Sequence, residues 1–105
     1  MGRKKNIDQL KEFKEEVSKD IKLNKMILFG SRATGKATRY SDFDLILVSP
    51  SFRRKKSFQR GIGLYKHWHL DYPVDFLCYT PEEFNKLKKQ ITIVREAVKE
   101  GIEIK

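Results

Sequence analysis

The sequence predicts an α/β fold, a small mixed β-sheet of about three to four strands covered by helices. Three short apolar runs, at 26–29, 43–48 and 74–79, have the length and composition of buried strands. The segments around them repeat apolar residues at three- and four-residue steps, with Lys and Glu between, as amphipathic helices do. We expect a single domain over residues 1–105, because this length supports one hydrophobic core but not two.

The first part of the chain predicts a helix, a strand and a short helix. Residues 7–21 carry apolar side chains at helical spacing, and Asn6 is the expected N-cap. The apolar run 26–29 is too short for a helix and stops at a glycine, so it predicts a strand. Ser31 is then expected to cap a short helix over 32–34.

The second part continues the alternation of helices and strands. Ser57 is expected to begin a helix that bears Phe58, Ile62, Tyr65 and Trp68. The sequence Asp71-Tyr72-Pro73 ends it. Thr80 is the expected N-cap of the next helix. Its apolar stripe is Phe84, Leu87, Ile91, Val94 and Val98. A break is expected near Lys89, and residues 102–104 predict an edge strand.

Composition narrows the classes of partner. Lys plus Arg is 23 and Asp plus Glu is 14, so the formal net charge is +9, which favours nucleotides, nucleic acid or an acidic protein. Cys78 is the one cysteine, which excludes an intramolecular disulfide and a thiolate zinc site. No apolar run approaches the ~20 residues of a membrane helix, so we expect a cytoplasmic protein.

The segment 30–45 carries the chemical signal, and its first half nearly matches a P-loop, G-x-x-x-x-G-K-[ST]. A P-loop needs a hydroxyl after its lysine to bind Mg²⁺, but Ala37 follows Lys36. It also needs a long helix after the loop, whereas here a strand is predicted within a few residues. We therefore set the P-loop interpretation aside.

Asp42 and Asp44 support a different interpretation. Residues two apart on a strand face the same side, and two adjacent carboxylates repel each other unless a cation lies between them. Mg²⁺ binds to one or two protein carboxylates together with phosphate oxygens and water. The alternative is a turn acid followed by a solvated strand acid. Asp44 lies between Phe43 and Leu45 in an apolar strand, where an unpaired carboxylate is costly, and this favours a site.

Residues 30–45, with Gly30-Ser31 followed by Ser41-Asp42-Phe43-Asp44, closely resemble the signature of the DNA polymerase β-like nucleotidyltransferase superfamily. The resemblance is strongest to its shortest branch, the minimal nucleotidyltransferase (MNT) domains, and it implies a polymerase β palm-like fold. It also implies that Gly30 and Ser31 contact NTP phosphates and that Asp42 and Asp44 bind Mg²⁺.

In that family a third carboxylate on a later strand completes the metal site and is often assigned as the base that activates the attacking hydroxyl. Asp75, in the apolar strand 74–79, fits this place, and Asp71 in the preceding break is its competitor. Lys36 and Arg39 lie near the expected triphosphate, so we predict that they are auxiliary phosphate contacts.

The resemblance implies a function: Mg²⁺-dependent transfer of a nucleoside monophosphate, AMP from ATP or another NTP, to an acceptor hydroxyl. Many small members act as antitoxins beside a HEPN-domain toxin, which implies such a partner here. The alternative is an antitoxin that neutralises its toxin by binding alone. A basic nucleic-acid binder is a third hypothesis, but no nucleic-acid motif supports it.

The two histidines, two aromatic residues and the basic run 53–56 are each expected to have a structural role rather than a place in the site. His67 and His69 would face different directions on a helix, so they make a poor metal pair. Tyr65 and Trp68 are expected in the core. The basic run 53–56 is expected to be a solvated loop, with a phosphate or acidic-partner contact as the alternative.

Overall fold

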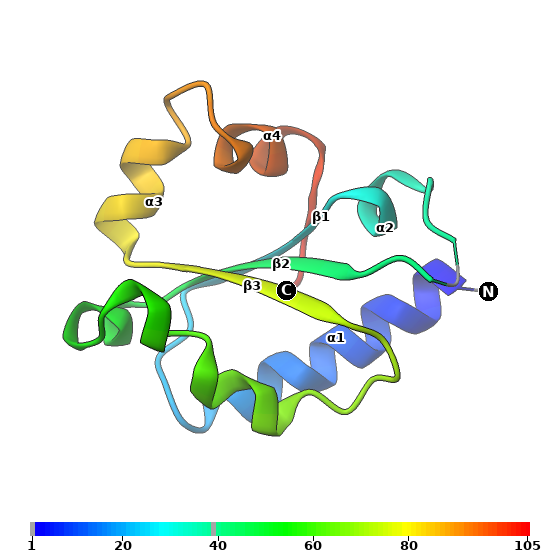
Figure 1. Ribbon diagram of the computed structural model, residues 1–105, viewed down its shortest axis with the longest axis horizontal. Coiled ribbons are helices and arrows are strands. Elements are labelled where there is room, and N and C mark those ends of the chain that lie inside the picture. Colours follow the sequence, from blue (N-terminus) through cyan, green and yellow to red (C-terminus); the bar gives the residue numbers. More distant parts are fainter. Residues whose placement is uncertain (1, 39) are drawn as a thin grey trace.

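The computed structural model describes residues 2–38 and 40–105, and it contains a four-stranded mixed sheet (Figure 1). The strands are β1 (Lys25–Phe29), β2 (Phe43–Val48), β3 (Val74–Tyr79) and β4 (Ile102–Glu103), in the order β3-β2-β1-β4. β1 pairs antiparallel with both β2 and β4, whereas β2 and β3 are parallel. The three predicted apolar strands and the predicted edge strand are confirmed.

Helical segments cover both faces of the sheet. One face packs against α1 (Gly2–Ser18) and two 3₁₀ segments, η1 (Pro50–Arg54) and η3 (Ile62–His67), between which lies the exposed 3₁₀ segment η2 (Ser57–Gln59). The other face packs against α3 (Pro81–Leu87) and α4 (Ile93–Glu100), which lie on the opposite side of the ribbon in Figure 1. A short helix, α2 (Ser31–Thr34), follows β1.

Alternation along β2 divides the core between the two faces. Phe43, Leu45 and Leu47 are buried against the α1 side. Ile46 and Val48 are buried against the α3–α4 side. Successive side chains on a strand point to opposite faces, so Asp44 belongs to the α3–α4 face. It occupies a position that the pattern would otherwise give to an apolar residue.

The ends of two predicted helices differ from the expectation. α1 begins at Gly2, so Asn6 lies inside the helix and is not its N-cap. The polar residues that precede Asn6 extend the helix because nothing in their sequence stops it. Ser31 is the first residue of α2, and the N-cap position belongs to Gly30. A serine was expected there, but the backbone at that position has a positive φ that favours glycine.

The predicted helix from Ser57 to Trp68 was wrong, because η2 and η3 are separate short segments joined at Arg60 and Gly61. Arg60 is buried there, and its guanidinium donates hydrogen bonds to the Cys78 carbonyl and to the Glu83 carboxylate. These contacts hold the connection against β3, one of the two edge strands of the sheet. The apolar spacing does not form a buried stripe.

The expectation that Tyr65 and Trp68 lie in the core was half right. Trp68 packs edge-on against Phe13 and Phe43, and its indole N–H donates to the Tyr72 carbonyl at 2.8 Å. Tyr65 is 52% exposed, so it is not a core residue.

The helix start at Thr80 is confirmed, since its hydroxyl accepts from the Glu83 amide and the Glu83 carboxylate accepts from the Thr80 amide. Beyond Leu87 the predicted stripe is right at Val94, which is buried, and wrong at Ile91 and Val98, which are exposed. The chain breaks at the expected place and α4 begins again at the N-cap Thr92. This restart changes the helical phase, so Ile91 is 94% exposed.

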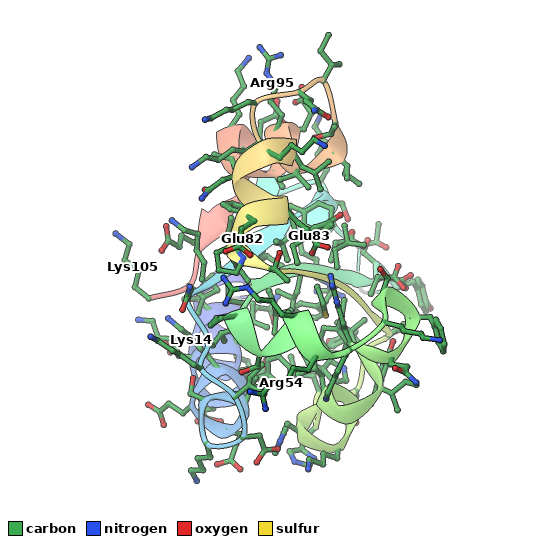
Figure 2. All side chains as sticks on the ribbon, turned by 90° about the vertical axis from the view of Figure 1, so that its left-hand side faces the viewer. Lys14, Arg54, Glu82, Glu83, Arg95 and Lys105 are labelled. Carbon is green, nitrogen blue, oxygen red and sulfur yellow. The ribbon has the colours of Figure 1, made fainter. Side chains whose placement is uncertain are left out.

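The basic run 53–56 is exposed, as expected, but its first two residues belong to η1 rather than to an irregular loop. Arg53 forms an ion pair with Glu82, which lies at the base of α3 beside the green η1 ribbon (Figure 2). Among the described residues, none of the helices is both long and apolar enough to cross a membrane.

Candidate functional site

A cleft of about 600 Å³ opens on the α3–α4 face, between α2 and α4. The loop and sheet contribute Gly30, Asp44 and Asp75 to its lining. α4 contributes Glu96 and Glu100 on the opposite wall. Three of the predicted site residues therefore line one concave surface.

Asp44 and Asp75 are direct neighbours across the sheet. They are paired positions in the parallel register of β2 and β3, so their side chains emerge on the same face, one strand spacing apart. Asp42 precedes β2 by one residue, and its two-residue separation from Asp44 suits the same face. The side chain of Asp44 is half-buried, and those of Asp42 and Asp75 are exposed.

The electrostatics of Asp44 reflect this arrangement. Burial raises the pKa of the Asp44 carboxyl above its ordinary value, and the negative charges of Asp75 and Asp42 raise it further. No ion pair among the described residues involves any of these three carboxylates. Their repulsion is therefore not compensated by a protein cation in the described part of the chain.

Gly30 forms the floor of the site beside Asp44. Its φ of 76° and ψ of −159° lie in a region that L side chains rarely adopt. A Cβ atom at this position would also lie well under 3.0 Å from Oδ2 of Asp44. Glycine is thus required twice, by the backbone conformation and by the close approach of the carboxylate.

The comparisons with known proteins agree with this geometry. The family model of the nucleotidyltransferase domain matches residues 10–100. The chain belongs to the nucleotidyltransferase domain family. A relative from Methanocaldococcus jannaschii, named "Putative protein adenylyltransferase", is 29% identical over 100 residues, which span 93% of this chain and 97% of the relative.

The fold of this nucleotidyltransferase domain also matches a crystal structure titled as "a putative nucleotidyltransferase from Sulfolobus solfataricus". The TM-score is 0.69 at 22% sequence identity, and the match covers 96% of this chain and 80% of the other. The predicted family and the predicted α/β fold are confirmed.

The donor set of this nucleotidyltransferase domain suits a hard divalent cation. Within the described residues, no three His, Cys, Asp or Glu side chains are already arranged to hold a metal ion. Mg²⁺ needs only one or two carboxylates when nucleotide phosphates and water complete its coordination. The pair of Asp44 and Asp75, with uncompensated negative charge and oxygen donors on one face, fits that requirement.

The predicted phosphate contacts remain predictions. Ser31 is half-buried at the start of α2, directly after Gly30. Lys36 is exposed just beyond the Gly35 cap, and its amide donates to the Ser31 carbonyl at 3.0 Å. Neither side chain lines the cleft. Arg39 lies outside the described residues.

Sequence reasoning missed three features of the site. Glu96 and Glu100 look like ordinary solvent-facing helix residues, and only the packing of α4 brings them to the cleft. Tyr65 also lines the cleft, and its hydroxyl donates to the Val74 carbonyl at 3.4 Å. Arg32 lies behind the site, against the chain that leads to Asp42. No residue spacing in the sequence indicates these positions.

Proposed function

We propose that this nucleotidyltransferase domain transfers a nucleoside monophosphate, AMP from ATP, to an acceptor hydroxyl with the help of Mg²⁺. The observation that carries the proposal is the register of Asp44 and Asp75 on one face, beside Gly30 and within electrostatic reach of Asp42. Membership of the family supports the transfer, and the name of the M. jannaschii relative supports the adenylyl group.

Each residue has a proposed role. Asp42, Asp44 and Asp75 hold the ion, which when bound neutralises charge on the phosphates and orients them for in-line attack. Gly30 and Ser31 contact the phosphates, because a glycine without a Cβ lets the backbone approach them closely. Lys36 and Arg39 add positive charge near the triphosphate.

The reaction is a displacement at phosphorus. The acceptor oxygen forms a bond to the α-phosphorus, and the bond from that phosphorus to the oxygen bridging to the β-phosphate breaks. Pyrophosphate leaves with the electron pair of that bond. The hydroxyl proton passes to the carboxylate of Asp75, whose exposed side chain at the edge strand is open to an incoming acceptor.

We further propose that the acceptor is a protein, and that this protein is a HEPN-domain toxin for which the chain is the antitoxin. The relative's name describes an adenylyltransferase of proteins. The resemblance of residues 30–45 to the MNT branch supports a HEPN-domain toxin as the partner.

The test is incubation of the chain with α-labelled ATP, Mg²⁺ and a co-purified HEPN partner. We expect label on the partner with the wild type and with Asp71→Asn, an exposed aspartate in the break before β3. Asp44→Asn should lower the rate at least ~100-fold, because it removes a carboxylate from the site. Transfer by Asp44→Asn at the wild-type rate would refute the proposal.

A second candidate is an antitoxin that acts by binding alone. It is favoured by the formal net charge of +9, which suits contact with an acidic partner protein. The double variant Asp42→Asn and Asp44→Asn separates the two functions. If it still binds the partner and still silences the toxin in cells, binding alone suffices. If it binds and the toxin stays active, transfer is required.

A further inference from the structure

Arg32 holds the chain that leads into the aspartate pair. Its Nε and Nη2 atoms both donate to the Ser41 carbonyl oxygen, at 2.9 Å and 2.7 Å. Ser41 directly precedes Asp42. A side chain from α2, which begins beside Gly30, is therefore tied to the backbone one residue before the first carboxylate.

The same guanidinium lies against two aromatic rings. Its Cζ atom is 4.3 Å from the ring centroid of Phe43 and 4.4 Å from that of Tyr72. Phe43 separates Asp42 from Asp44, and Tyr72 lies three residues before Asp75. The Phe43 amide also donates to the Pro73 carbonyl at 2.9 Å, which joins these two segments directly. Arg32 thus contacts both chain segments that lead to the three aspartates, the one before Asp42 and Asp44 and the one before Asp75.

Two hydrogen bonds connect Thr38 with Ser41, the residue that Arg32 holds. The Thr38 amide donates to the Ser41 hydroxyl at 2.9 Å, and the Ser41 amide donates back to the Thr38 carbonyl at 3.1 Å. Because the Ser41 carbonyl and the Asp42 amide belong to one planar peptide unit, holding that carbonyl also restrains the direction in which the chain enters Asp42.

We propose that Arg32 is the positioning residue of the metal site, which sets Asp42 relative to Asp44 and Asp75 without touching the substrate. This inference rests on the proposed function. Arginine suits the task better than lysine, because its planar fork donates two N–H groups to one oxygen while its face lies on aromatic rings. An ammonium group has neither the fork nor the plane.

The experiment compares Arg32→Lys with Arg60→Lys. Both replace a guanidinium that donates to backbone carbonyls, but Arg60 binds Cys78 and Glu83 at the far end of β3. Mn²⁺ binding in the presence of ATP is measured by electron paramagnetic resonance, and amide hydrogen exchange is measured without metal. Thermal unfolding followed by circular dichroism identifies a temperature at which both variants are folded, and the other measurements are made at that temperature.

We expect Arg32→Lys to weaken Mn²⁺ binding about 10–100-fold, as loss of an outer ligand-orienting contact does elsewhere. It should also speed exchange at the Ser41 and Phe43 amides at least tenfold. The kcat should fall while the KM for the acceptor is unchanged. Arg60→Lys should leave Mn²⁺ binding, exchange at the Ser41 and Phe43 amides, and kcat unchanged. If Arg32→Lys does not fold, Tyr72→Leu, which removes one ring, should weaken Mn²⁺ binding several-fold.

The outcomes separate the two proposals. Unchanged exchange at Ser41 and Phe43 in Arg32→Lys overturns the positioning role, whatever the wild type catalyses. Faster exchange with unchanged Mn²⁺ affinity and unchanged kcat also overturns it. A wild type that binds neither Mn²⁺ nor ATP refutes the proposed function instead.

Discussion

Replacing Gly30 by alanine is the sharpest perturbation that the site offers. The substitution adds one methyl group, yet it acts on two features at once. The backbone at Gly30 has φ 76° and ψ −159°, and the new Cβ would meet Oδ2 of Asp44. Gly35→Ala is the matched control. Gly35 also has a positive φ, 84°, but no described residue beyond its chain neighbours lies within 4 Å of the place its new methyl group would take.

The expected magnitudes follow from these two features. A non-glycine residue in the backbone region of Gly30 costs about 1–3 kcal/mol. Moving the Asp44 carboxyl away from the new methyl group forces its side chain off a preferred rotamer, at about 0.5–1.5 kcal/mol. The sum is about 1.5–4.5 kcal/mol. Gly35→Ala should cost only about 1–2 kcal/mol, the penalty for alanine in the left-handed helical region.

Urea unfolding measures the free energies of unfolding of Gly30→Ala and Gly35→Ala, and the label-transfer assay measures their rates of nucleotide transfer. Gly30→Ala should be the less stable variant by about 1–2 kcal/mol, since it adds a clash to the backbone strain. Its transfer rate should fall at least tenfold, roughly the effect of 1.4 kcal/mol on a barrier. Equal stability of the two alanine variants, with full transfer by Gly30→Ala, would refute this explanation of the glycine.

Three further predictions concern the rest of the chain. Arg60 lowers the pKa of Glu83, so this pair stabilises the fold above the ordinary pKa of glutamate and loses its effect as the pH falls through the lowered value. Glu83→Gln should therefore lower the free energy of unfolding by about 1–3 kcal/mol at pH 7, less than the loss of a fully buried pair because the Glu83 side chain is 42% exposed. In urea titrations at several pH values, the free energy of unfolding of this variant should fall less steeply in acid than that of the wild type. Burial raises the pKa of Cys78 to about 12, so a thiol reagent at pH 8 should label the native protein much more slowly than the urea-unfolded protein, and equal labelling rates would contradict this prediction. Thr92→Ala removes the N-cap bond to the Arg95 amide and should cost about 1 kcal/mol, with Thr92→Ser close to wild type in the same measurement.

Much of the site was predictable because its residues are close in sequence or have a strong local pattern. Asp42 directly precedes β2 and Asp44 lies two residues further along, so a common face was expected from strand geometry alone. Asp75 was expected from the family resemblance, which implies a third carboxylate on a later strand, and it stands in the otherwise apolar strand 74–79. Its register with Asp44 came from the pairing of β2 with β3, which local pattern does not determine.

The helices show where such patterns fail. Apolar spacing from Ser57 onward resembled one helix, but the burial of Arg60 against β3 and Glu83 breaks the segment in two. Beyond Leu87 the predicted stripe included the buried Val94 but misassigned Ile91 and Val98, because α4 starts with a new phase at Thr92. In both places a tertiary contact or a cap outweighs the weak local preference for one continuous helix.

By itself the sequence determined the strands, the Gly-Ser turn and the two aspartates at the start of β2, Asp42 just before it and Asp44 within it, because each depends on near neighbours and on the alternation of apolar residues. Only the tertiary structure decided which strands are adjacent, that Gly30 touches the Asp44 carboxylate, and that α4 brings Glu96 and Glu100 to the cleft. It also decided that Arg32 reaches Ser41. These contacts join segments distant along the chain, and their formation depends on the summed burial of both sheet faces rather than on any local propensity.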